Sequence, residues 1–160
     1  MTKQDFTEQI TAREQTLYRV ARSILKREPD QQDAVQETVA KAWAKRDSLR
    51  DERMFGTWIT RILINECNTV IRRHRRIVLM QDWQEDALTT PDAFSQTTGV
   101  EEAMDALPEK LRLPVVLHYM EGFSLAEIAD ILHIPLGTVK VRLHDARKAL
   151  KLELTSNEEA

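Results

Sequence analysis

Apolar residues recur every three or four positions along most of the chain, which is the spacing of one face of an α-helix. Three such patterns fill the first half of the 160-residue sequence and predict helices over about 6–25, 34–43 and 55–76. Pro29 separates the first two patterns because proline is not tolerated inside a helix, and Asp30 is positioned to cap the second helix. Glycine and proline are sparse, so the pattern predicts an all-α fold.

The segment that follows residue 100 combines two prolines with one glycine. Pro108 suits the start of a helix, whereas Pro114 does not suit the interior of one. We therefore expect a short turn near 108–112 and a main helix from about Leu113 to Met120, which Gly122 ends.

Two short apolar patterns near the C-terminus are separated by only a few residues. Ser124 and Glu127 have the spacing of a capping box at the start of the first helix, and the turn His133–Pro135 precedes the second. The side chains expected to face the core are Leu125, Ile128, Ala129 and Leu132 in the first helix and Leu136, Val139, Leu143, Ala146 and Leu150 in the second. Such a pair is a helix-turn-helix, whose second helix enters the major groove of DNA.

Helical periodicity fails between about residues 78 and 98. This stretch is rich in Thr, Ser, Gln and Asp and contains Pro91, which is typical of a linker. It is also long for a connection inside one compact domain. The sequence therefore predicts two small helical domains, 1–77 and 99–160, joined by a flexible acidic linker, 78–98.

The formal net charge of −3 conceals a strong partition along the chain. Residues 1–80 hold 16 Lys and Arg against 11 Asp and Glu, whereas residues 81–108 hold 7 acids and no Lys or Arg. Residues 133–151 hold 5 Lys and Arg against Asp145 alone. Charge blocks usually mark solvated surface, but two basic patches on helices favour nucleic-acid binding.

The helix predicted over 55–76 carries a polar stripe opposite its apolar face. Spacings of three and four residues align Arg61, Asn65, Asn68, Arg72 and Arg76 on one side. Four arginines surround His74 at its end: Arg72, Arg73, Arg75 and Arg76. One cation would complement the negative end of the helix dipole, so the surplus favours phosphate binding over a plain polar face.

The last helix forms the other basic patch. Five polar side chains are expected to face outward: Lys140, His144, Arg147, Lys148 and Lys151. Thr138 lies at the helix start, where a hydroxyl and free backbone N–H groups suit a phosphate. The capping box, the tight turn and the basic second helix favour DNA binding over a helical hairpin with a solvated cationic face. They do not separate a repressor from an activator or an initiation factor.

The stretch SLAEIADILHIPLGTVKVRLHDARKAL resembles the promoter-binding C-terminal domain of sigma factors of the extracytoplasmic-function group. The match lies in Glu127–Ala129, Gly137–Lys140 and Asp145–Arg147. The first half resembles the same family in DQQDAVQETVAKAW and in FGTWITRILINECNTVIRRHRR, which occur in the family's order. The chain departs from the family pattern at His133, where glycine is frequent, and at Val141. The resemblance therefore does not determine the sequence of the target promoter.

This resemblance implies a transcription initiation factor that binds core RNA polymerase, directs it to specific promoters and assists promoter opening, without being an enzyme. It implies contacts with the −35 promoter element by Thr138, Lys140, Arg142, His144, Arg147 and Lys148. It implies contacts with the −10 element by Trp58, Arg61, Asn65, Arg72, Arg73, Arg75 and Arg76. Asn65 is suited to hold a base that leaves the stack. For Trp58 the sequence leaves two roles open, a core position or stacking on a base.

The resemblance also implies partners. The second helix would bind core polymerase through Asp33, Gln36, Glu37 and Lys41. Without the resemblance, these residues favour a plain solvated helix face. Family members are usually held inactive by an anti-sigma factor, often at the membrane. No small-molecule substrate is implied.

Other classes of function find little support in the sequence. The 4 glycines form no phosphate-cradling loop, the 4 histidines are scattered, and the single cysteine, Cys67, lies on an apolar helix face, so we expect no cofactor and no metal site. The N-terminus lacks the apolar core of a signal peptide and no run approaches transmembrane length, which predicts a cytoplasmic protein. A stand-alone helix-turn-helix regulator and a helical adaptor without a nucleic-acid role remain as alternatives.

Overall fold

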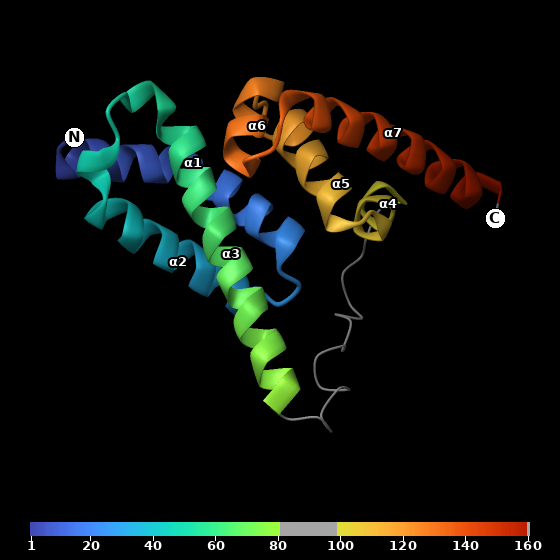
Figure 1. The fold of residues 1–160 in the computed structure, drawn as a ribbon, viewed down its shortest axis with the longest axis horizontal. Coiled ribbons are helices and arrows are strands. Elements are labelled where there is room, and N and C mark those ends of the chain that lie inside the picture. The colour runs from blue at the N-terminus through green and yellow to red at the C-terminus, as the bar shows by residue number, and fades with distance from the viewer. Residues whose placement is uncertain (81–98, 160) are drawn as a thin grey trace.

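The computed structural model consists of two helical halves that pack against each other (Figure 1). It describes residues 1–80 and 99–159, with side chains as far as Leu152. Most of the predicted linker lies outside the described residues. Those residues form helices and turns and no strand, which confirms the all-α prediction. None of the described helices is both long enough and apolar enough to cross a membrane.

The first half is a bundle in which the long helix α3 packs on both α1 and α2. A capping box between Thr2 and Asp5 begins α1. The elements are α1 (Lys3–Ile24), α2 (Glu28–Ala44), the short 3₁₀ turns η1 (Arg46–Ser48) and η2 (Glu52–Met54), and α3 (Phe55–Met80).

The ends of α2 and α3 differ from the predictions. Pro29 lies in the first turn of α2, where its missing N–H group costs no hydrogen bond, and the helix begins before Asp30. The predicted cap at Asp30 is therefore wrong, and the Asp30 carboxylate lies 3.2 Å from the imidazole of His74 instead. α3 continues past Arg76 to Met80, so the first three residues of the predicted linker are helical.

In the second half, α7 packs on α4, α5 and α6. The elements of this half are α4 (Gly99–Ala106), α5 (Glu109–Val115), the π turn η4 (Val116–Met120), α6 (Leu125–Leu132) and α7 (Leu136–Glu159). In Figure 1, α6 lies beside the N-terminal part of α3. The two halves are in contact through α3 with α6 and through α1 with α5 and η4.

Pro114 lies inside α5, so the prediction of a separate turn before it is wrong. The helix starts directly after Pro108 and passes into η4, in which the Glu121 N–H group donates to the Val116 carbonyl at 3.0 Å. Proline removes a helical hydrogen bond, but Pro114 is fully buried. Its packing and the wider π turn accommodate the ring. Gly122 ends the segment as predicted, with a φ of 78°.

The buried side chains of the two halves form one continuous cluster. Phe55 and Leu63 of α3 and Leu117 of η4 are among its fully buried members. Of the residues predicted to face the core in α7, Val139, Leu143 and Ala146 are buried. Leu136 is 42% exposed because it is the first residue of the helix. Ile131 of α6, which was not among the predicted core positions, is buried.

Candidate nucleic-acid interface

α6 and α7 form the predicted helix-turn-helix. The Glu127 N–H group donates to the Ser124 hydroxyl at 3.1 Å, and the Ser124 N–H group donates to the Glu127 carboxylate at 3.0 Å, so the predicted capping box is present. His133 ends α6 in the left-handed region, with a φ of 56°, and its N–H group donates to the Ala129 carbonyl. Histidine thus adopts the backbone conformation that glycine takes without strain.

The exposed side of α7 is cationic, as the sequence predicted. Val139, Leu143 and Ala146 are buried on its inner side. Five polar side chains are exposed: Lys140, His144, Arg147, Lys148 and Lys151. A helix of this kind fits the major groove, where lysine and arginine bind phosphates and guanine edges.

Arg147 is held by a residue that the sequence analysis missed. Its guanidinium donates a hydrogen bond of 2.9 Å to the phenol oxygen of Tyr119 in η4. The Tyr119 ring lies 4.8 Å from the ring of His118, whose Nδ1 lies 2.9 Å from the Phe123 carbonyl. Tyr119 and Arg147 are 28 residues apart, so no local spacing could have indicated the pair.

Thr138 and Arg142 lie apart from this exposed face. Thr138 is half-buried, and its N–H group donates to the Pro135 carbonyl at 3.0 Å, so that N–H is not free for a phosphate. Arg142 is half-buried and borders a pocket of about 410 Å³ between the two halves. Asn65 and Asn68 of α3 line the same pocket. Candidate −35 and −10 residues therefore meet around one pocket.

α3 presents the predicted polar stripe, with one change near its N-terminal end. The exposed members are Asn65, Asn68, Arg72 and Arg76, and Arg73 and Arg75 are exposed beside them. Arg61 is only partly exposed, because its guanidinium donates to the backbone carbonyl of Asp130 at 2.7 Å and to its carboxylate at 3.1 Å. The C-terminal end of the stripe is thus cationic and exposed, whereas Asp130 of α6 occupies the Arg61 guanidinium.

Two other side chains of α3, His74 and Trp58, contact residues of the first half and do not point into solvent. His74 lies 3.2 Å from Asp30 of α2, so it does not belong to the arginine surface. Trp58 is half-buried and packs against the core, with its ring centroid 5.7 Å from that of Phe55. This packing favours the core position for Trp58 over base stacking.

The outer face of α2 is exposed at three of the four candidate polymerase contacts, Asp33, Gln36 and Glu37. The fourth, Lys41, is half-buried and forms an ion pair with Glu66 of α3. Lys41 therefore ties α2 to α3.

Cys67 is fully buried on the inner side of α3. Burial, together with the negative charges of Glu109 and Glu66, raises the pKa of its thiol to about 12. Because the thiolate is the reactive and metal-binding form, Cys67 acts as a core residue. Among the described side chains, no group of three His, Cys, Asp or Glu could hold a metal ion.

Comparison with known proteins divides the chain at the same place as the fold. Residues 10–77 match the family model of Sigma-70 region 2, and residues 98–150 match that of Sigma-70, region 4. Over 150 residues the chain is 31% identical to RNA polymerase sigma factor SigV of Bacillus subtilis strain 168, covering 93% of this chain and 90% of that protein. It is 29% identical over 154 residues to the ECF RNA polymerase sigma factor SigW of the same strain, covering 86% and 82% respectively.

A solved structure shares the arrangement of both halves. The sigma factor RpoE from Bartonella quintana, in its co-crystal structure with the anti-sigma factor NepR, gives a TM-score of 0.80 at 28% sequence identity. The superposition covers 94% of this chain and 97% of that one.

Proposed function

Because the chain belongs to the sigma-70 family of RNA polymerase sigma factors, in its extracytoplasmic-function group, we propose that its two basic helix faces read the two elements of a promoter. The protein is a transcription initiation factor that binds core RNA polymerase and directs it to promoters. The observation that carries the proposal is that each matched region presents one cationic helix, α3 in region 2 and α7 in region 4. A stand-alone regulator would need only α7 and leaves the first half unexplained.

We assign the −35 element to the exposed side of α7. Lys140, His144, Arg147 and Lys148 are exposed there. Their positive charge supports binding to phosphates and guanine edges. Thr138 and Arg142 are half-buried and lie apart from this face, so their assignment to the −35 element rests on the sequence resemblance alone.

We assign the −10 element to the stripe on α3. Asn65 is exposed and has an amide that can both donate and accept, which suits the edge of a base that has left the stack. Arg61 lies one helical turn before Asn65, and the remaining arginines would hold the phosphates: Arg72, Arg73, Arg75 and Arg76. Trp58 would support the helix from its core side.

The proposed partners follow from the exposed faces and from the relatives. Asp33, Gln36 and Glu37 present an exposed polar face on α2 that suits core polymerase, while Lys41 stabilises that face from within. Because RpoE was solved with an anti-sigma factor, we propose that an anti-sigma factor also holds this chain inactive. The site of action would be the cytoplasm, where polymerase and promoter DNA lie. The two regions, which share one core cluster in this structure, would separate into two units joined by residues 81–98 when polymerase and promoter bind.

The proposal is tested by reconstitution with purified core RNA polymerase. The protein should co-elute with the core enzyme in size-exclusion chromatography, and the variant Asp33→Ala/Glu37→Ala should co-elute poorly. Glu14→Ala, which removes an exposed acid from α1, is the control and should co-elute like the wild type. Failure of the wild-type protein to bind core polymerase, with nanomolar binding to a duplex operator by the free protein, would favour the regulator.

A further inference from the structure

We propose that Val141 and Asp145 determine which bases the exposed side of α7 accepts, Val141 by contact with the C5-methyl group of a thymine and Asp145 by accepting a hydrogen bond from the N4 amino group of a cytosine. The residues assigned above to the −35 element include neither of them. The inference rests on the function proposed for α7 and adds to it the chemistry of two bases within that element.

Val141 is an apolar side chain in the middle of a cationic helix face. It is 58% exposed, and it lies opposite the buried side that Val139 and Leu143 form. His144 and Lys148, which are exposed three and seven residues further along, share its stripe. Val141 does not belong to the side chains that pack against the core of the described residues. The fold of the protein therefore does not explain an apolar residue at this position.

Asp145 follows Val141 by one helical turn and is the only acid among the described side chains of α7. Its carboxylate is exposed and forms no hydrogen bond or ion pair with any described residue. Arg142 and Lys148 lie three residues away on either side, within reach of an intrahelical pair. Because neither pair forms, neutralisation of a neighbouring cation does not explain the acid.

DNA offers these two residues other partners than it offers the cations around them. Lysine and arginine gain from the phosphates whatever the base sequence, whereas an aliphatic side chain gains nothing there and a carboxylate is repelled. In the major groove, the favourable partner of an apolar side chain is the thymine methyl group, and that of a carboxylate is the cytosine amino group. The two residue types on this face therefore specify bases.

Gly137 allows this stripe to approach the base pairs closely. It lies one helical turn before Val141, and a Cβ atom at Gly137 would meet nothing within 4 Å. A left-handed backbone does not require glycine there either, since Gly122 is the only described glycine with a positive φ. A missing side chain on the outward stripe suits a close approach to a ligand. α7 would thus lie nearest to DNA in its first two turns, where recognition helices contact base edges.

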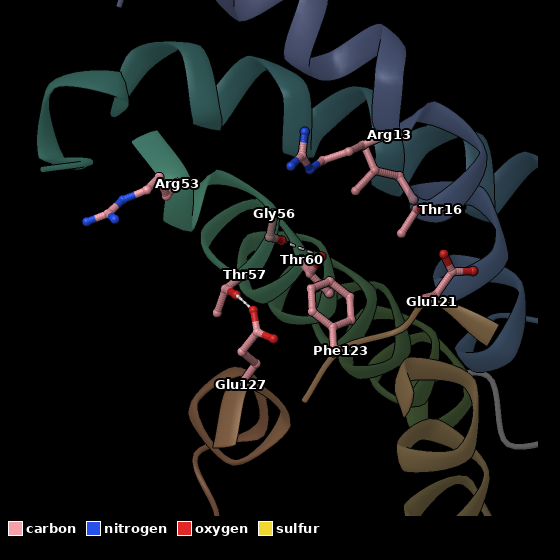
Figure 2. A pocket seen from close by; sticks show the side chains of 10 residues that line it. Arg13, Thr16, Arg53, Gly56, Thr57, Thr60, Glu121, Phe123 and Glu127 are labelled. Carbon is pink, nitrogen blue, oxygen red and sulfur yellow. Dashed lines mark hydrogen bonds between the residues drawn. The ribbon is translucent and has the colours of Figure 1, made fainter. Parts of the chain in front are cut away.

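This face of α7 is accessible while the two halves are in contact. The second half contacts the first through α5, α6 and η4. At the start of α6, Glu127 points toward Thr57 of α3, whose hydroxyl donates to its carboxylate at 3.2 Å (Figure 2). In Figure 1, α7 extends from α6 away from the first half. Val141 and Asp145 are therefore exposed without any change in the packing of the two halves.

The first experiment compares thymine with deoxyuracil in a promoter bound by the holoenzyme. The promoter is selected by transcription from a randomised library with purified core polymerase and this protein. Each thymine of its upstream element is then replaced by deoxyuracil, which lacks only the C5-methyl group, and affinity is measured by fluorescence anisotropy. We expect one replacement to weaken binding of the wild-type holoenzyme on the order of threefold to tenfold, the loss of one apolar contact. The same replacement should have no effect on the Val141→Ala holoenzyme.

Leu152→Ala is the matched control, because Leu152 is a 64% exposed apolar residue of the same helix. It lies about 16 Å further along the helix axis than Val141, too far to reach the same base pair. The Leu152→Ala holoenzyme should respond to deoxyuracil like the wild type. Since Val141 is exposed, its replacement by alanine should leave core polymerase binding unchanged. If no thymine shows methyl dependence in the wild type, or if Val141→Ala retains that dependence, the thymine contact is overturned.

The second experiment repeats the library selection with Asp145→Asn. Asparagine keeps the size of the side chain, but its amide pairs with adenine. The preference at one position of the upstream element should therefore change from cytosine to adenine, on one strand, while the other positions stay the same. Glu14→Gln, which removes an exposed acid from α1, should select the wild-type sequence. An unchanged preference in Asp145→Asn overturns the cytosine contact.

These measurements separate the inference from the function on which it rests. If the library yields no promoter that depends on the protein, or if Lys140→Ala leaves promoter binding unchanged, α7 does not bind the −35 element and the inference fails with the proposed function. If Lys140→Ala weakens binding while the deoxyuracil scan and the Asp145→Asn selection show no change, the proposed function stands and the roles of Val141 and Asp145 are wrong.

Discussion

Lys140 and Arg147 are exposed cations on α7, so their loss should affect DNA binding and leave the fold unchanged. We expect Lys140→Ala and Arg147→Ala each to weaken promoter binding by the holoenzyme by about 1–3 kcal/mol, the range for one base-edge contact. Fluorescence anisotropy on a labelled promoter measures this, with core polymerase affinity unchanged. Lys26→Ala, an exposed cation of the first half, is the control. Wild-type affinity in both α7 variants would place the recognition face elsewhere.

Asn65 should act at a different step from the α7 cations. Since it is exposed on the stripe shared with Arg72, we expect Asn65→Ala to impair promoter opening more than closed-complex binding. Permanganate reactivity of thymines in the −10 region should fall while holoenzyme binding to the closed promoter is kept. Gln15→Ala, an exposed amide on α1, should leave reactivity unchanged. Normal reactivity in Asn65→Ala would refute the base-capture role.

Single residues were predictable from sequence where spacing decides which side of a helix they occupy. The outward position of Lys140 follows directly from the buried Val139 and Leu143. Partners across the fold were not predictable: Arg61 and Asp130 are 69 residues apart, so no local pattern links them. Lys41 was assigned to an outer face for the same reason, since its partner Glu66 lies on another helix.

The capping box of α6 gives a prediction at the level of one element. Ser124→Ala removes the hydroxyl that accepts from the Glu127 N–H group, which should lower the free energy of unfolding by about 0.5–2 kcal/mol. Thermal unfolding followed by circular dichroism measures the loss. Thr11→Ala is the control, since its hydroxyl bonds only the Thr7 carbonyl within α1 and is exposed. Equal effects of the two substitutions would show that the box contributes nothing.

At the level of elements, periodicity predicted which segments are helical. The predicted ends of two helices were wrong, and in both cases the reason is a proline. Pro29 predicts a break between the first two helices with a cap at Asp30, yet a proline in the first turn loses no helical hydrogen bond, and α2 begins before it. Pro114 predicts a separate turn over 108–112 before the main helix, yet it is completely buried inside α5, which passes into a π turn. Both errors arise because the tolerance of proline depends on hydrogen bonds and packing that sequence spacing does not contain.

The contact between the two halves should depend on pH, because the Arg19 guanidinium of α1 forms hydrogen bonds with the Glu121 carboxylate of the second half. Burial raises the pKa of Glu121, but hydrogen bonds from Arg19 and Thr16 and the charge of Arg19 outweigh this and hold the pKa below its ordinary value when the halves are in contact. The separated state therefore binds protons first, so the contact is fully stabilised above the ordinary glutamate pKa of about 4.3 and weakens as pH falls through the lower pKa of the contact state.

Spin labels on Gln32→Cys in α2 and Asp145→Cys in α7, two exposed positions, measure the distance between the halves. We expect the narrow distance distribution at pH 7 to broaden as pH falls below about 4.3. The Glu121→Gln variant lacks the titrating carboxylate, so its distance distribution should respond less to pH than that of the labelled wild type. A distribution that stays narrow in acid, while circular dichroism shows that the helices persist, would contradict the role of this carboxylate.

Across the whole molecule, the two helical halves were predictable and their shared core was not. The break in periodicity near residue 78 separates the segments that match two family regions. The apolar faces show which side chains turn inward, but not that Phe55 of one half and Leu117 of the other belong to one continuous cluster. The shared core depends on contacts between residues before 81 and residues after 98, which the spacing of apolar residues within one segment does not reveal.

The assignment of α3 and α7 to separate promoter elements is tested most directly by transcription from a randomised promoter library with purified core polymerase and this protein. We expect enrichment of promoters with two conserved elements at one fixed spacing. Lys140→Ala should relax only the upstream element, and Asn65→Ala only the downstream one. Enrichment that is unchanged in both variants, or the absence of any promoter that depends on the protein, would contradict the assignment.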